Sequence, residues 1–192
     1  MEIYFPRRFL LFESVAVYWM VGQVMEQRDC VISVCIITYK RPNGLSDLLE
    51  SLVIQTLMEL RNVEIVVVDN DSKRSAESII KEFITRNPDI AVTYEVEPVQ
   101  GIPQARNRSV KLAKGKFIAF IDDDETADPA WLEVLFECMK KYGADAVFGP
   151  VTPILPPDCA RWLRKGRFFD RPHHEDGSVI GVGRTNNANG RP

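Results

Sequence analysis

The sequence lacks several signatures by which nucleotide- and metal-binding proteins are commonly recognised. It contains no G-x-G-x-x-G and no G-x-x-x-x-G-K-[ST] run, which excludes the usual dinucleotide fingerprint and the P-loop. Its four cysteines form no C-x-x-C pair, which argues against a zinc or thioredoxin-like site. Cys35 and Cys138 fall in apolar periodic segments, as expected of reduced thiols in a core. This cysteine usage predicts a cytoplasmic protein.

The sequence also lacks a large excess of charge of either sign. The chain has 24 Lys and Arg against 27 Asp and Glu, a formal net charge of −3, and its basic residues form no block. Nucleic-acid-binding proteins usually present a basic face. We therefore expect no nucleic-acid partner.

The N-terminal region holds no uninterrupted apolar run long enough for a signal peptide or a membrane-spanning helix. Arg7 and Arg8 precede an apolar segment, 9–25, which Glu13 interrupts. Two interpretations stay open: an interfacial helix that contacts the inner face of a membrane, or an extension that arises from an over-extended start codon. Neither changes the interpretation of the rest of the chain.

What the sequence does have is a regular alternation of strand and helix patterns from residue 31 onward. At 192 residues the length suits one domain. The alternation predicts an α/β fold with a doubly wound, mostly parallel sheet flanked by helices. We expect three parts: an N-terminal extension, a ligand-binding α/β domain, and an irregular C-terminal region, over residues 1–28, 29–150 and 151–192. The strands are predicted at 31–38, 63–69, 90–96, 116–121 and 144–149.

The most informative segment is FIAFIDDDE, at 117–125. Its apolar half predicts a buried strand, which would place Asp122, Asp123 and Asp124 together at the carboxyl end of that strand. Ligands of open α/β sheets bind at that end. Adjacent carboxylates repel one another unless a cation neutralises them, and their hard oxygens suit Mg²⁺ or Mn²⁺. The simpler alternative is a solvated acidic turn before a helix that Asp128 and Pro129 open.

Other polar residues follow the remaining predicted strands and should meet the acid cluster at the same edge. Tyr39 and Arg41 follow the first strand, Asp69 closes the second, and Arg106 follows the third. An aromatic ring, a lone acid, basic side chains and an acid cluster are the parts needed to hold a nucleoside diphosphate. Taken singly, Tyr39 could border the core, Asp69 could cap a turn, and Arg106 could be a solvated charge.

These motifs, in this order, resemble family 2 glycosyltransferases of the GT-A fold, of the type that builds bacterial exopolysaccharides. The resemblance covers about residues 31–150. Its pieces are VISVCIITYKRP, EIVVVDNDS, GIPQARNRSVKLAKGKFIAFIDDDE and the helix after Asp128-Pro129-Ala130-Trp131. A single D-x-D run would be weak evidence, whereas four ordered motifs are specific.

The resemblance implies a metal-dependent, inverting transfer of a sugar from a nucleotide-diphosphate donor to an acceptor hydroxyl. A UDP-sugar is the favoured donor, and the acceptor would be a saccharide or a lipid-linked molecule. By resemblance, Asp124 binds Mn²⁺ or Mg²⁺, and Asp122 contacts the ribose or the metal. Asp123 completes the D-x-D element. The remaining nucleotide-sugar contacts are assigned to Thr38, Tyr39, Arg41, Asp69 and Arg106.

No general base can be assigned. In the family this carboxylate follows an acceptor-binding stretch, and 184–187 (RTNN) resembles only the start of that stretch. Glu175 and Asp176 precede it, so neither is assigned, and His173-His174 fits a solvated loop better than a second metal site. We therefore expect a C-terminally truncated family member. The alternative to an active enzyme is a nucleotide- and metal-binding module that lacks its base.

Two other classes also place acids at the strand ends of a parallel sheet. A phosphoacceptor receiver domain would need a Lys at a later strand end, where this chain has Pro150-Val151-Thr152. A nucleotidyltransferase would need a Gly-rich signature near the first strand, for which Pro42-Asn43-Gly44 is a poor substitute. Both are weaker interpretations than the glycosyltransferase.

Overall fold

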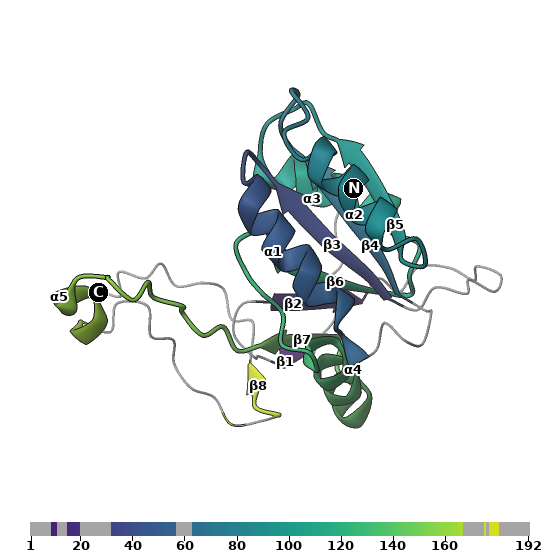
Figure 1. The fold of residues 1–192 in the computed structure, drawn as a ribbon. Coiled ribbons are helices and arrows are strands. Elements are labelled where there is room, and N and C mark those ends of the chain that lie inside the picture. The colour runs from purple at the N-terminus through teal and green to yellow at the C-terminus, as the bar shows by residue number, and fades with distance from the viewer. Residues whose placement is uncertain are drawn as a thin grey trace, which may run out of the picture.

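A computed structural model describes residues 9–10, 15–19, 32–56, 63–166, 175 and 177–180. The elements, labelled in Figure 1, are β1 (Phe9–Leu10), β2 (Val15–Trp19), β3 (Ile32–Thr38), α1 (Pro42–Val53), β4 (Val63–Asp69), α2 (Glu77–Arg86), β5 (Ala91–Val96), α3 (Ile102–Leu112), β6 (Phe117–Asp122), α4 (Trp131–Tyr142), β7 (Ala146–Gly149), α5 (Arg161–Lys165) and β8 (Val179–Ile180).

The strands form one sheet in the order β5-β4-β3-β6-β2-β7-β1-β8. The first four strands in this order are parallel to one another. The chain moves outward from β3 to β4 and β5, then returns to place β6 on the other side of β3. This change of direction is the switch point of a doubly wound sheet, where ligands bind. The predicted α/β class is confirmed.

The other half of the sheet is mixed, which the predicted pattern did not include. β2 pairs antiparallel with both β6 and β7, β1 is parallel to β7, and β8 is antiparallel to β1. Residues 15–19 are thus a strand, not the interfacial helix that was one interpretation of segment 9–25. No helix in the described part of the chain is long and apolar enough to cross a membrane.

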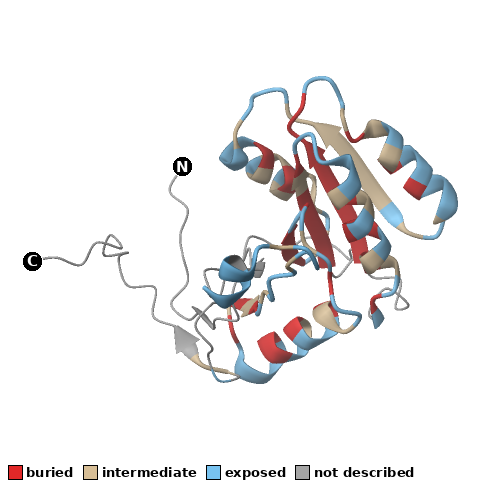
Figure 2. Ribbon diagram, turned by 60° about the vertical axis from the view of Figure 1, so that its left-hand side comes forward, coloured by how far each residue is buried: buried red, intermediate tan, exposed pale blue. Residues whose placement is uncertain are grey.

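Helices cover both faces of the parallel strands because these strands are apolar on both sides. One face packs against buried residues of α1, α2 and α4, including Leu48, Phe83 and Leu135. On the opposite face, Cys35 and Val66 pack under α3. Figure 2 shows the fully buried strands between the more exposed helices. Burial raises the pKa of the Cys35 thiol to about 12, which keeps it protonated.

The helix predicted after the acid cluster begins two residues later than Asp128-Pro129 indicated. α4 starts at Trp131, and Asp128 forms the turn before it: its Oδ1 accepts from Ala130 N at 3.0 Å. Its backbone carbonyl accepts from Trp131 N at 2.9 Å. A side chain that bonds the backbone two residues ahead favours a turn over a first helical residue. Pro129 therefore belongs to the turn.

A buried polar network fixes the edge of the sheet opposite the predicted site. Glu64 is 4% exposed, and its Oε1 accepts from Ser33 Oγ at 2.6 Å and from Lys114 N at 2.5 Å. Ser33 Oγ accepts in turn from Gly115 N at 2.8 Å. These bonds join the starts of β3 and β4 to the loop that enters β6. The network thus holds the strand that carries the acid cluster in register.

Candidate nucleotide and metal site

The strand register brings three predicted site residues to the same edge of the sheet. Thr38 pairs with Asp69 across β3 and β4, and Ile37 pairs with Asp122 across β3 and β6. All three site residues close their strands, so the parallel arrangement gathers them. The expectation that polar strand ends converge is therefore confirmed in the geometry, although their roles stay predictions.

Asp123 is the anchored member of the acid cluster. Its residue is 6% exposed, and Oδ2 accepts a hydrogen bond of 2.8 Å from the Thr38 hydroxyl. A hydrogen bond from a buried hydroxyl fixes the orientation of the carboxylate. Thr38 thus contacts the acid cluster, and its assignment to the nucleotide pocket stays a prediction.

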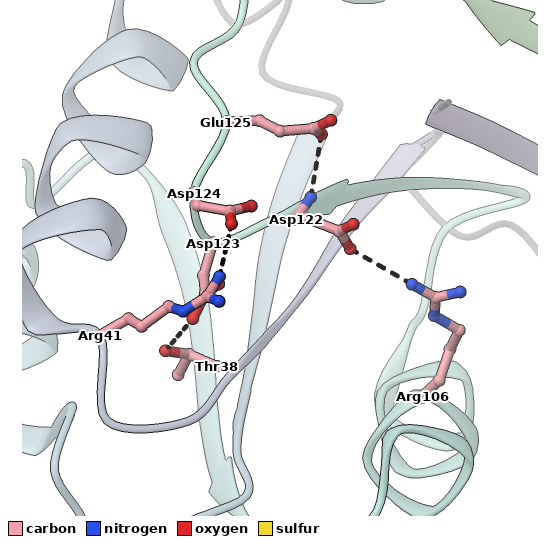
Figure 3. Close-up of polar contacts among 7 residues, drawn as sticks. All are labelled: Thr38, Arg41, Arg106, Asp122, Asp123, Asp124 and Glu125. Carbon is pink, nitrogen blue, oxygen red and sulfur yellow. Dashed lines mark hydrogen bonds and ion pairs between the residues drawn. The ribbon is translucent and has the colours of Figure 1, made fainter. Parts of the chain in front are cut away.

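Arg41 joins the two carboxylates that follow β6. Its Nη1 lies 3.2 Å from Asp123 Oδ1 and 2.5 Å from Asp124 Oδ2, as Figure 3 shows. The charges of these two carboxylates raise the pKa of the Arg41 guanidinium. Two carboxylate oxygens therefore converge on one cationic group at the end of the strand.

Asp122 takes a different partner. Its Oδ1 lies 3.3 Å from Arg106 Nη2, and in Figure 3 the pair lies apart from Arg41. The Arg106 guanidinium also lies 5.2 Å from the centre of the Phe120 ring. Its Nε is buried without a hydrogen-bond partner among the described residues. Asp124 and Asp123 thus share the Arg41 guanidinium, whereas the family resemblance implies Asp124 and Asp122 as metal ligands.

Glu125 belongs to this cluster, and the sequence analysis did not include it among the site residues. Its Oε2 accepts from Asp122 N at 3.2 Å, which closes the turn after β6 (Figure 3). Burial is the largest cause of its raised pKa, and the charges of Asp122 and Asp124 add to it. Its position directly after the three aspartates was the available signal.

Asp69 lies at the same edge with its carboxylate bound by the protein itself, and its contact with a nucleotide base stays a prediction. Asp69 is fully buried, and its carboxylate accepts from Asp71 N at 2.9 Å, Ala76 N at 2.8 Å and Tyr94 Oη at 3.1 Å. Burial, followed by the Asp69 charge, raises the pKa of Tyr94 well above its ordinary value. A carboxylate engaged in this way has no exposed oxygen for a nucleotide base. The contacts agree with the alternative that Asp69 organises the loop after β4.

The neighbouring Asn70 was missed, although it fixes a second loop at the site. Its Nδ2 donates to Glu97 O at 2.8 Å and to Val99 O at 2.9 Å. Its Oδ1 accepts from Gly101 N at 2.7 Å. Gly101 immediately precedes α3, which carries Arg106, so Asn70 positions that helix relative to the strand edge. An Asn in a DND turn carried no signal that distinguished this role from an ordinary turn.

Tyr39 is accessible at the same edge. It is 39% exposed, and Lys40 Nζ lies 4.7 Å from the centre of its ring. Lys40 has a positive φ of 56°, which marks a sharp turn between β3 and α1. An exposed ring of this kind can stack on a planar ligand group.

A cleft of about 920 Å³ opens beside the acid cluster. It is lined by the loop from Asp124 to Asp128, the start of α4 and the segment 149–154. Trp131 contributes to its wall, and the Trp131 indole N–H is buried without a hydrogen-bond partner among the described residues. The volume is in the range of small-molecule sites.

The residues fit a divalent cation that a ligand helps to hold. Asp123 Oδ1 and Asp124 Oδ2 both face the Arg41 guanidinium, so two hard oxygens converge on one positively charged group. Within the described ranges, no three His, Cys, Asp or Glu side chains are grouped as a complete metal site. Mg²⁺ commonly takes one or two protein carboxylates and completes its shell with phosphate and water.

Several predicted features lie outside the described residues. These are Cys30, His173-His174, Asp176 and the RTNN run at 184–187. Glu175 is described and exposed, and its backbone carbonyl accepts from Ser178 N at 3.0 Å. The missing general base therefore stays a sequence-based expectation.

A model of glycosyl transferase family 2 matches residues 33–187. Because this match covers most of the chain, the chain belongs to glycosyl transferase family 2, a family of enzymes. The receiver-domain and nucleotidyltransferase interpretations are thereby set aside.

Two curated proteins have sequences similar to this chain. The succinoglycan biosynthesis protein ExoM of Rhizobium meliloti is 37% identical over 137 residues, which are 71% of this chain and 43% of ExoM. The glycosyltransferase GlyA of Streptococcus pneumoniae is 31% identical over 121 residues, 63% of this chain and 17% of GlyA. The chain thus spans less than half the length of these relatives.

Solved structures of Staphylococcus aureus TarS show the same fold. One TarS structure aligns with a TM-score of 0.51 and 26% identity, and covers 59% of this chain and 20% of TarS. A shorter TarS form in complex with UDP aligns with a TM-score of 0.52 and 25% identity. It covers 59% of this chain and 33% of that chain. The GT-A fold is therefore confirmed.

Proposed function

We propose that this chain binds a nucleotide-diphosphate sugar, with a UDP-sugar favoured, and takes part in transfer of the sugar to an acceptor hydroxyl. The acceptor would be a saccharide or lipid-linked molecule in polysaccharide or glycoconjugate synthesis. One observation carries the proposal: two carboxylates converge on one point, filled here by the Arg41 guanidinium, at the switch-point edge of a GT-A sheet. The relatives' names and the UDP complex of TarS support the same substrate class.

The assigned residues would contact different parts of the donor and its metal ion. Asp123, oriented by Thr38, and Asp124 would hold Mn²⁺ or Mg²⁺, and Asp122 would contact the ribose. When bound, the ion offsets the negative charge that develops on the departing diphosphate. Tyr39 supplies a surface for stacking and Arg106 a positive charge near the phosphates.

The cleft beside Asp124 would hold the sugar and the incoming hydroxyl. Its position supports a sugar site on the side of the acid cluster that α4 and the 149–154 segment enclose. An inverting displacement needs a base within hydrogen-bond reach of that hydroxyl. No residue in the described part of the chain is assigned this role, so the catalytic residue stays unknown.

Calorimetric titration of the purified chain with UDP, with and without Mn²⁺, tests the proposal. We expect UDP binding that Mn²⁺ strengthens, followed by slow hydrolysis of a UDP-sugar in the same sample. Binding without hydrolysis would favour the alternative of a binding module without transferase activity. No binding of UDP, GDP or dTDP under either condition would contradict the proposed function.

A further inference from the structure

We propose that Arg41 is an internal counter-ion for the acid cluster, which releases Asp124 when a divalent cation binds. The inference rests on the proposed function, because that function gives the cluster a metal. It goes beyond assigning Arg41 to the nucleotide pocket, since it makes Arg41 a competitor of the metal. Arg41 would thereby set how tightly the free protein binds the ion.

The competition follows from the contacts of a single atom. Arg41 Nη1 lies between Asp123 Oδ1, at 3.2 Å, and Asp124 Oδ2, at 2.5 Å. A small divalent cation bound by the same two oxygens would lie about 2.1 Å from each of them. The nitrogen and the ion would then occupy the same space. Metal binding through these oxygens therefore requires the guanidinium to leave.

The two carboxylates differ in how readily they can exchange partners. The Asp123 side chain is 8% exposed, and Thr38 holds its other oxygen. The Asp124 side chain is 59% exposed, and its partner among the described residues is Arg41. The Arg41 side chain is itself 55% exposed, so it can turn into solvent without unpacking the core. We therefore expect Asp124 to exchange Arg41 for the ion, while Asp123 stays in place.

A structural clamp between α1 and the acid loop is the competing explanation for these ion pairs. A hydrogen bond of 2.9 Å from Ala127 N to Ser51 Oγ already joins α1 to the loop that follows the acid cluster. A Cβ atom at Gly44, in the first turn of α1, would lie 2.5 Å from the backbone oxygen of Asp123. Only glycine permits this approach, and it does not depend on the Arg41 side chain. The clamp role is therefore not needed to place the loop.

Binding of Mn²⁺ alone separates the two roles. Free Mn²⁺ can be followed by its electron paramagnetic resonance signal during titration of the full chain. Removal of an exposed competing cation should tighten binding by about threefold to tenfold in Arg41→Gln. UDP binding at saturating Mn²⁺ should be unchanged or weaker in the same variant. Thermal unfolding would check that the variant folds as the wild type does.

Two further arginines provide controls. Arg86 Nη1 lies 2.5 Å from Glu50 on the helical surface, with a similar exposed fraction of 48%, so Arg86→Gln should leave Mn²⁺ binding unchanged. The substitution Arg106→Gln removes the same charge from the same edge, but Arg106 pairs with Asp122. Arg106→Gln should therefore tighten Mn²⁺ binding less than Arg41→Gln does.

The outcomes decide the inference separately from the proposed function. Tighter Mn²⁺ binding by Arg41→Gln than by the wild type and both controls would support it. Equal or weaker binding by Arg41→Gln, or no measurable binding by either protein, would overturn it. Failure of wild-type UDP binding would instead contradict the proposed function, and the Mn²⁺ titrations would still decide whether Arg41 competes with the ion.

Discussion

The two halves of the sheet differ in how their positions are fixed. In the parallel half, β3, β4, β5 and β6 are six or seven residues long and pair in continuous register. Buried side chains secure the loops at both edges of this half. In the other half, β1 and β8 contain two residues each, β7 contains four, and parallel and antiparallel pairs are mixed.

Because of this difference, we expect the two halves to contribute differently to donor binding and to sugar transfer. The residues assigned to the nucleotide and the metal all lie in the parallel half or in its loops. The cleft proposed for the sugar and acceptor is walled partly by α4, which leads into β7, and by the segment after β7. We infer that donor binding depends on the parallel half, whereas transfer depends on both.

The largest effect is expected from Asp69→Ala, which tests whether a buried side chain organises the parallel half. The substitution would leave two backbone N–H groups and the Tyr94 hydroxyl without their acceptor. We expect the free energy of unfolding to fall by about 3 kcal/mol or more. Urea unfolding would measure it, with exposed Asp89→Ala as a control that should change stability by less than about 0.5 kcal/mol.

The role of β2 can be tested by Val17→Pro. Val17 pairs with Ala119 of β6 and with Val147 of β7, so proline would remove a ladder donor inside the sheet. We expect a loss of about 3 kcal/mol in the free energy of unfolding. An unchanged unfolding curve would contradict a structural role for β2. It would support the predicted boundary that leaves residues 1–28 outside the domain.

A smaller effect is expected from Thr38→Val, which links the strand edge to binding. The variant loses the hydroxyl that orients the buried Asp123 carboxylate. We expect Mn²⁺-dependent UDP binding to weaken by about 2 kcal/mol, since hydrogen bonds to charged groups contribute 1.5–3 kcal/mol. Thr38→Ser keeps the hydroxyl and should bind nearly as the wild type does. Equal affinities for wild type and Thr38→Val would contradict the orienting role.

Thiol labelling gives the least invasive comparison of the two regions. Cys35 is buried in β3 with a pKa near 12, whereas Cys159 follows β7 and is half-buried. Because the thiolate is the reactive form, we expect alkylation at pH 8 to modify Cys159 well before Cys35. Peptide mapping would measure both sites, and urea should abolish the difference. Equal labelling in the native protein would show that the parallel half opens readily.

The sequence allowed the parallel half to be predicted because its signals are local. Continuous apolar runs such as FIAFI mark buried strands, and parallel order places their polar ends at one edge. The orientation of the Asp69 side chain is not determined by adjacent residues, because it depends on hydrogen bonds from Tyr94 and Ala76. For the same reason, the pairing of Asp124 with Asp123 through Arg41 could not be predicted from spacing.

In the second half, β7 was predicted, within 144–149, but β1, β2 and β8 could not be, because they are short and pair over long chain distances. Two-residue strands carry no periodicity, and β2 pairs with residues about one hundred positions away in β6. The segment 9–25 has an apolar pattern that suits either a helix or a strand. Only its neighbours in the sheet distinguish these two structures.

The most direct test of the central claim compares the wild type with Asp124→Asn in UDP titrations with and without Mn²⁺. Asp124 is exposed and makes no core contact, so the variant should keep the wild-type melting temperature. The account predicts that Mn²⁺ strengthens UDP binding by the wild type and has no effect on the variant. A variant that responds to Mn²⁺ as the wild type does would show that the cation binds elsewhere and would contradict the account.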